Sequence, residues 1–287
     1  MADYRISGEW LKDDMVLLKI ARPETIDQIE SLDMKEGDVL IVGYPKTGTT
    51  WIQELIWLIC NDGDIATARS LPEFQRVPYL EVNYVGIDLL PQLPRPYVMK
   101  THLRSETFRK QIQAGKVKVI ICIRNPKDTL ISYYHFYRMN SMLGNFKGTW
   151  DEFFELYEVK HLIYGDYFQW YVSWLQHLDK ANVMLIKYED MHHKLPDVIN
   201  DVSEFLGKRL PEHVTDDVIQ HLTFDSMSSN DAVNHKNRTT FDQKISPFMR
   251  KGKIGDWKNY LTEAQSALVD KTYKEIIEPM GITLMFE

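Results

Sequence analysis

Residues 43–51 read Gly-Tyr-Pro-Lys-Thr-Gly-Thr-Thr-Trp, between a short apolar run and a segment that is apolar at helical spacing. A strand, a tight loop and a helix start in this order bring backbone N–H groups together on a phosphate. The spacing of Gly43 and Gly48 matches the first half of a P-loop. NTPases continue with Lys-Ser/Thr, whereas here Thr49 follows and the lysine stands at Lys46. The stretch therefore predicts a phosphate-binding loop whose reacting end differs from that of an NTPase.

Other β-like runs predict that this loop belongs to a parallel sheet. Short apolar runs without polar alternation are typical of parallel strands buried on both faces. Segments with helical spacing separate these runs, and such alternation indicates an α/β fold with three layers. We expect a single domain over residues 1–287, with a central parallel sheet flanked by helices. The expected strands are 39–42, 97–99, 117–123 and 183–187.

Caps and breakers locate the helices and loops. Gly115 is expected to end one helix in a left-handed conformation, and Pro126 suits the first turn of another. Residues 70–96 are rich in proline and residues 226–257 are polar with glycines, so both are expected to be ordered loops over a substrate site. The expected helices are 49–60, 105–113, 126–139, 150–158, 164–178, 196–206, 211–221 and 262–279.

Charge and composition restrict the classes of function. The net charge of −7 argues against general nucleic-acid binding, although a local cluster of cations could still hold a small anion. No apolar stretch approaches the roughly 18 residues of a membrane span, and the N-terminal segment lacks a signal-peptide pattern. Cys60 and Cys122 lie in apolar runs and are expected to be reduced thiols. We expect a cytoplasmic protein that binds neither nucleic acid nor membrane.

Polar side chains next to the predicted strands supply candidate chemistry. Ligands of open α/β sheets lie beyond the carboxyl ends of the strands. Lys100 and His102 end one strand, and a histidine there can take a proton from a hydroxyl at neutral pH. Because the chain has nine histidines, a structural role for His102 stays open on these grounds. Lys46 could reach an oxygen of a bound anion. The alternative is that the loop is an ordinary helix cap and that Lys46 is simply exposed to solvent.

Further cations and aromatic residues could bind a nucleotide. Arg124 ends the strand at 117–123, where its planar fork suits phosphate, although an ion pair with Asp128 fits nearly as well. Arg250 and Lys251 precede a glycine in a long loop, which favours close approach to an anion. The remaining candidates are the aromatic side chains Trp51, Tyr188 and Phe224, although each of them taken alone is more typical of a core residue.

Two other patterns resemble metal sites and are discounted. Glu189 and Asp190 follow a predicted strand, as Mg²⁺-binding acids do in NTPases, but the loop lacks Lys-Ser/Thr after Gly48. His192 and His193 are adjacent but lack further ligands. We therefore expect no metal.

Four linked motifs resemble the cytosolic sulfotransferases, and the similarity runs across nearly the whole chain. They lie in the order and spacing of that family. The family transfers a sulfuryl group from 3′-phosphoadenosine 5′-phosphosulfate (PAPS) to a hydroxyl or amine of a small acceptor, and PAP is the product. The resemblance implies the same activity without metal, because lysines take the neutralising role that Mg²⁺ has in kinases. The motifs are residues 44–51, 100–103, 124–137 and 246–252.

The resemblance also implies individual roles. Lys46 would stabilise charge on the bridging oxygen, Lys100 would assist at the sulfuryl oxygens, and His102 would deprotonate the acceptor for in-line attack. Ser132 would restrain Lys46 until acceptor is present. The implied donor-binding residues are Lys46, Thr47, Gly48, Thr49, Thr50 and Trp51 for the 5′-phosphosulfate, Arg124, Ser132, Arg250, Lys251 and Gly252 for the 3′-phosphate, and Trp51, Tyr188, Thr223, Phe224 and Met227 for the adenine.

The acceptor side is implied less directly, by aromatic positions of phenol-sulfating relatives. An apolar pocket with one base favours flat phenols, alcohols or amines. Asn140 stands where the family varies its acceptor selectivity. The implied acceptor-binding residues are Tyr79, Lys100, His102, Phe136, Tyr164 and Phe248.

The family's dimer motif, Lys-x-x-x-Thr-Val-x-x-x-Glu, is altered in this chain. Lys258 and Thr262 are present, but Glu263 replaces the valine and Ala267 replaces the glutamate. An apolar contact becomes a charge and an ion-pair partner is lost. We therefore expect a monomer or a weak homodimer.

Two alternative functions are disfavoured by the same residues. A P-loop kinase conflicts with the positions of Lys46 and Thr49. A non-catalytic nucleotide-binding protein on the same fold conflicts with the presence of Lys46, Lys100, His102 and Ser132 together.

Overall fold

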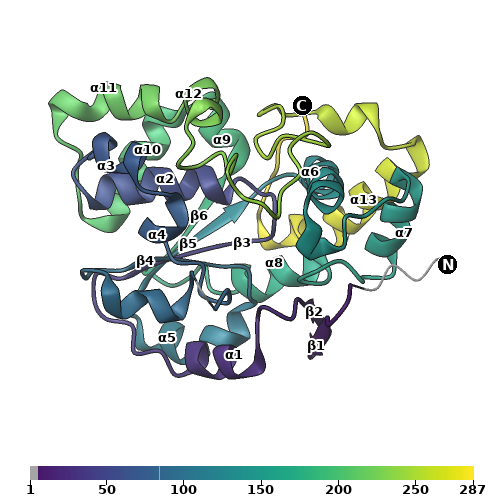
Figure 1. Ribbon diagram of the computed structural model, residues 1–287, viewed down its shortest axis with the longest axis horizontal. Coiled ribbons are helices and arrows are strands. Elements are labelled where there is room, and N and C mark those ends of the chain that lie inside the picture. The colour runs from purple at the N-terminus through teal and green to yellow at the C-terminus, as the bar shows by residue number, and fades with distance from the viewer. Residues whose placement is uncertain (1–5, 84) are drawn as a thin grey trace.

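A parallel sheet forms the centre of the computed structural model, which describes residues 6–83 and 85–287 (Figure 1). Part of the N-terminal segment tested for a signal peptide lies outside these residues. The described sheet has four strands, and because they are parallel their carboxyl ends meet at one edge. In spatial order they are β4 (Val98–Thr101), β3 (Val39–Gly43), β5 (Lys118–Ile123) and β6 (Val183–Lys187).

The sheet is buried on both faces, as its unbroken apolar strands predict. Along β3, Val39 and Ile41 belong to one hydrophobic core, while Leu40 and Val42 belong to a second core on the opposite face. This alternation follows from the two-residue period of a strand. Each core needs its own layer of helices, which gives the predicted three-layer α/β arrangement.

Helices cover the two faces in separate groups (Figure 1). On one face, α2 (Thr49–Cys60) packs with α10 (Leu195–Leu206) against the core that contains Ile41. On the other, α8 (Tyr167–Leu175) buries its aromatic side chains, and α6 (Pro126–Met139) and α13 (Glu263–Ile276) join the same core. The expected fold class is confirmed.

Several predicted helix ends are wrong for identifiable reasons. The helix expected at 164–178 begins only at Tyr167, because Tyr164 and Gly165 adopt positive φ and Asp166 caps the helix. The helix expected at 105–113 is divided into a 3₁₀ turn, η2 (Ser105–Phe108), and α5 (Arg109–Ala114); its left-handed cap at Gly115 is confirmed.

The two segments expected to be loops are partly helical. The N-terminal region also contains strands and a helix that the sequence analysis did not predict. Residues 70–96 contain α4 (Glu73–Arg76) and η1 (Ile87–Gln92). The loop at 226–257 begins within α12 (Phe224–Ser229). The other described elements are β1 (Trp10–Lys12), β2 (Met15–Leu17), α1 (Pro23–Glu30), α3 (Ile65–Ser70), η3 (Ser141–Leu143), α7 (Trp150–Glu158), α9 (Tyr188–His193), α11 (Glu212–His221), η4 (Asp256–Asn259) and η5 (Glu278–Met280).

None of the helices in the described part of the chain combines the length and apolar character that crossing a bilayer requires.

Candidate active site

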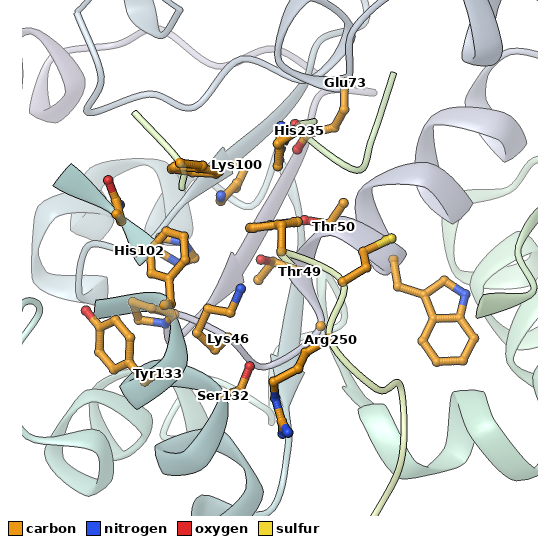
Figure 2. A pocket seen from close by; sticks show the side chains of 18 of the residues that line it. Lys46, Thr49, Thr50, Glu73, Lys100, His102, Ser132, Tyr133, His235 and Arg250 are labelled. Atoms are coloured by element: carbon orange, nitrogen blue, oxygen red, sulfur yellow. Dashed lines mark ion pairs between the residues drawn. The ribbon is translucent and has the colours of Figure 1, made fainter. Parts of the chain in front are cut away.

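A cavity of about 250 Å³ opens at the carboxyl edge of the sheet and gathers nearly all the predicted site residues (Figure 2). Two do not line it. Thr47 is buried and its hydroxyl donates to the Tyr44 carbonyl at 2.7 Å, while Thr223 caps α12 by accepting from the Ser226 amide. Asn140 also lines the cavity. The predicted residues that do line it are Lys46, Gly48, Thr49, Thr50, Trp51, Tyr79, Lys100, His102, Arg124, Ser132, Phe136, Tyr164, Tyr188, Phe224, Met227, Phe248, Arg250, Lys251 and Gly252.

The loop before α2 leaves the helix N-terminus available to an anion. Gly48 occupies the N-cap position at φ 94°, and no side chain caps the helix. Free N–H groups at a helix N-terminus favour negative charge. Lys46 also has a positive φ of 72°, which is uncommon for a lysine and typical of a constrained functional loop.

His102 is held in one tautomer by the strand that precedes the loop. Its Nδ1 lies within hydrogen-bonding distance of the Gly43 carbonyl, which can only accept, so Nδ1 carries the proton. Nε2 is then the free acceptor. Burial, followed by the charge of Lys100, moves the pKa of His102 well below its usual value despite the opposing bond to Gly43, so the ring is neutral at pH 7.

Two tyrosines and a buried acid support His102. The rings of Tyr79 and Tyr164 pack edge-on against the imidazole, with centroid distances of 5.2 and 5.3 Å, and their hydroxyls bond each other. The backbone N–H of His102 donates to Glu81 Oε1 at 2.7 Å. Burial raises the pKa of Glu81 to about 7. The imidazole of His102 is therefore held in place by both backbone and side-chain contacts.

Lys46 extends between two aromatic rings. Its Nζ lies 4.5 Å from the centroid of Phe136 and 4.0 Å from that of Phe248. Burial, and then the charges of Lys100, Arg124 and Arg250, lower its pKa to about 7. In Figure 2 Ser132 on α6 points toward Lys46.

Lys100 packs on Tyr79 and lies near two buried acids. Its Nζ lies 4.0 Å from the ring centroid of Tyr79. Burial lowers the pKa of Lys100, and the carboxyl groups of Glu73 and Glu81 oppose that shift.

A second group of cations lies on the α6 side of the cavity. The Arg124 guanidinium packs 4.2 Å from the ring centroid of Tyr188, and its Nε is buried without a hydrogen-bond partner among the described residues. Arg250 and Lys251 both pair with Asp256, at 2.5 and 2.7 Å. Burial alone would raise the pKa of Asp256, but the hydrogen bonds from Lys251 and Arg250 outweigh this effect and lower the pKa to about 2.

Aromatic rings complete this side by packing on two glycines. A Cβ at Gly48 would lie 2.4 Å from Cδ2 of Tyr188, and one at Gly252 would lie 2.1 Å from Cδ2 of Phe224. Trp51 packs edge-on against Tyr188. The aromatic slot expected from the sequence is thus assembled beside the cations.

Several cavity residues were missed from the sequence. The sequence marks His192 only as a candidate metal ligand, but its ring packs 5.1 Å from that of Trp51 and lines the cavity. Glu73, His235 and Arg238 lie in the two expected loops and carried no spacing signal. The described residues contain no group of three or more His, Cys, Asp or Glu side chains placed to hold a metal ion.

The structure thus combines a three-layer α/β fold with a cavity at the carboxyl edge of its sheet that is lined by cations and aromatic rings. The family model described as "Sulfotransferase domain" matches residues 36–281. Sulfotransferase 1C2 of Homo sapiens is 34% identical over 98% of this chain and 97% of that protein, and sulfotransferase 1A1 of Bos taurus is 38% identical over 87% of this chain and 86% of its own length. The chain therefore belongs to the sulfotransferase family and is a PAPS-dependent sulfotransferase.

Solved structures support the same assignment. Mouse sulfotransferase SULT7A1 complexed with PAP superposes with a TM-score of 0.76 at 26% identity, covering 95% of this chain and 96% of that one. A retinol dehydratase solved with androsterone and PAP gives a TM-score of 0.83, with 95% and 90% coverage; at 23% identity this likeness bears on the fold. The kinase and the non-catalytic alternatives are set aside.

Proposed function

We propose that the protein moves the sulfuryl group of PAPS in line to a hydroxyl or amine of a small hydrophobic acceptor, with His102 as the base. The observation that carries this proposal is the tautomer of His102. Because Gly43 accepts the Nδ1 proton, Nε2 faces the cavity as a neutral acceptor, and Lys46 and Lys100 line the same space. A base must be unprotonated and within reach of the proton it removes.

The two cationic regions of the cavity suit the two anionic ends of PAPS. PAPS supplies an activated sulfuryl group when bound. The uncapped N-terminus of α2 with Lys46 suits its phosphosulfate, and Arg124 with Arg250 and Lys251 suits the 3′-phosphate. The unpartnered Nε of Arg124 supports this assignment, because a buried donor without a partner is costly.

Lys46 and Lys100 would stabilise the charge that develops on transfer. Both are desolvated, so their electrostatic effect on a nearby oxygen is stronger than in water. With the donor bound, the nearby anion would favour the protonated form of Lys46, so its ammonium group could donate a hydrogen bond to the leaving oxygen. Ser132 would position Lys46.

The acceptor would enter between the aromatic side chains. Tyr79, Tyr164, Phe136 and Phe248 surround the space in front of His102 and Lys46. Flat apolar walls with one base favour phenols, alcohols and arylamines. Asn140 on the same cavity would modulate the choice.

Replacing His102 tests the proposal. We expect His102→Ala to abolish sulfuryl transfer while PAP still binds with near-normal affinity, as measured by radiolabelled-donor assay and calorimetry. His213→Ala, on the exposed side of α11, serves as the matched control and should keep turnover. Turnover of His102→Ala within about tenfold, or about 1.4 kcal/mol, of the parent would exclude His102 as the base.

The remaining expectations are also proposals. We infer one domain over residues 1–287, a cytoplasmic location and no dependence on metal, nucleic acid or membrane. Relatives named as sulfotransferases 1C2 and 1A1 match over most of their length, which is consistent with these inferences.

A further inference from the structure

Glu73 and His235 lie at one end of the cavity and have no role in the chemistry proposed above. Glu73 begins α4 and is only 5% exposed. Its Oε2 faces Nε2 of His235 across 4.0 Å. Figure 2 shows the two side chains next to each other, with Lys100 between them and His102. Nearby cations favour a carboxylate, but its burial is costly unless a partner also bonds it.

The gap between these side chains has the size of one bridging atom. A separation of 4.0 Å is too long for a direct hydrogen bond, but an oxygen about 2.8 Å from each side chain would bond both. The imidazole of His235 is held in place by rings, with centroid distances of 4.4 Å to Phe248 and 5.7 Å to Phe241.

The surroundings select a neutral group with both a donor and an acceptor. Burial, followed by the charge of Arg238, keeps the pKa of His235 well below its usual value, so its ring is neutral and can donate at Nε2. Burial raises the pKa of Glu73, against the charges of Lys100 and Arg238. These two cations disfavour an ammonium ion at this position, and the carboxyl group of Glu73 disfavours an anion. A hydroxyl donates to the carboxylate and accepts from the imidazole.

We propose that Glu73 and His235 form a second acceptor subsite, which binds a neutral hydroxyl at the far end of the acceptor while His102 receives the hydroxyl to be sulfated. Aromatic rings connect the two ends, since Tyr79 packs on His102 and Phe248 on His235. The favoured substrate class is a rigid apolar diol. This inference rests on the proposed function and specifies its substrate.

Two matched acceptors test the subsite. Biphenyl with a para-hydroxyl on each ring has both groups, whereas its monomethyl ether cannot donate at the far end. The diol has a statistical advantage of about twofold in kcat/KM, because either hydroxyl can react. We expect the parent protein to prefer the diol by at least about tenfold, the effect of one good hydrogen bond. In Glu73→Met the preference should fall to about twofold.

Controls separate this role from a structural one. PAP affinity by calorimetry reports whether each variant is folded. Glu73→Gln keeps an acceptor oxygen and should retain more of the diol preference than Glu73→Met. Glu204→Gln, an exposed acid on α10, should leave the preference unchanged.

The outcomes are distinguishable. A parent preference of only about twofold, with the monomethyl ether sulfated, overturns the subsite and leaves the proposed function standing. An unchanged preference in folded Glu73→Met also overturns it, and assigns Glu73 as a counter-ion of Lys100 alone. Failure of the parent to sulfate any phenol while PAP binds overturns the proposed function and the subsite with it.

Discussion

At the scale of single residues, Lys46 is the side chain whose protonation state matters most. Its ammonium group lies between the rings of Phe136 and Phe248, away from any carboxylate partner among the described residues, and near three other cations. Burial and like charge therefore disfavour its protonated form until an anion arrives. We therefore expect binding of the donor to be linked to the charge of Lys46.

This linkage predicts proton uptake on nucleotide binding. In the free protein the pKa of Lys46 is lowered to about 7, and a phosphate beside it would raise that pKa again. At about pH 8 Lys46 is mostly neutral before binding, so PAP binding should take up a proton, and PAP affinity should fall as pH rises above 7. Calorimetry in buffers of different ionisation enthalpy measures the uptake. Lys46→Met should bind without it; buffer-independent heats in the parent would contradict the linkage.

The sequence predicts those site residues that belong to local patterns. Lys46, His102 and Arg124 each follow a predicted strand, so the topology of a parallel sheet brings them to one edge. Glu73 begins the short helix α4 and His235 lies in a long loop, so their approach depends on how these two segments pack, which no spacing in the sequence encodes.

At the scale of elements, two glycine positions allow rings to pack on loops. Gly252 has φ 59°, in the left-handed region, and the ring of Phe224 at the start of α12 occupies the place of its missing side chain. The cationic segment 250–252 is thereby held against the aromatic slot.

Gly252→Ala should separate these two parts. The added Cβ would lie 2.1 Å from Phe224, so the ring or the loop must shift, and we expect PAP affinity by calorimetry to fall at least about tenfold, or 1.4 kcal/mol. Gly281→Ala is the matched control, because it has a similar φ of 77° but no heavy atom within 4 Å of the new Cβ. Equal affinities in the two variants would show that contact with Phe224 is unimportant.

Element prediction succeeded where the pattern was local. The helix at 49–60 has the predicted bounds, because its apolar periodicity begins directly after the left-handed Gly48. The start of α8 was missed, because a positive φ at Tyr164 has no sequence signal comparable to a glycine. The strand order β4-β3-β5-β6 depends on tertiary pairing and could not be predicted from the separate runs.

At the scale of the whole molecule, the segment that corresponds to the family's dimer motif makes contacts within its own chain. Lys258 pairs with Glu287 at 2.8 Å, and the Thr262 hydroxyl caps α13 by accepting from the Gln265 amide. Glu263 and Ala267 lie exposed on that helix. The surface therefore presents a charge where the family motif has an apolar residue.

We expect a monomer at micromolar concentration, measured by light scattering. As a check on the cause, Glu263→Val together with Ala267→Glu restores the family motif and should increase the dimer fraction. A stable dimer of the parent protein through this segment would contradict the prediction.

The carbonyl of Gly43 has a consequence for redesign. This residue ends β3, orients His102 and opens the donor loop, and a Cβ there would lie 2.7 Å from Thr49 Cγ2 and 3.0 Å from Thr47 Oγ1. On the roles proposed above, a substitution at Gly43 would therefore disturb the orientation of His102 and the loop that follows β3 together. Glu73 and His235 belong to segments outside the sheet, so an engineer who wishes to redirect the enzyme to a new drug or pollutant should diversify those segments and leave β3 intact.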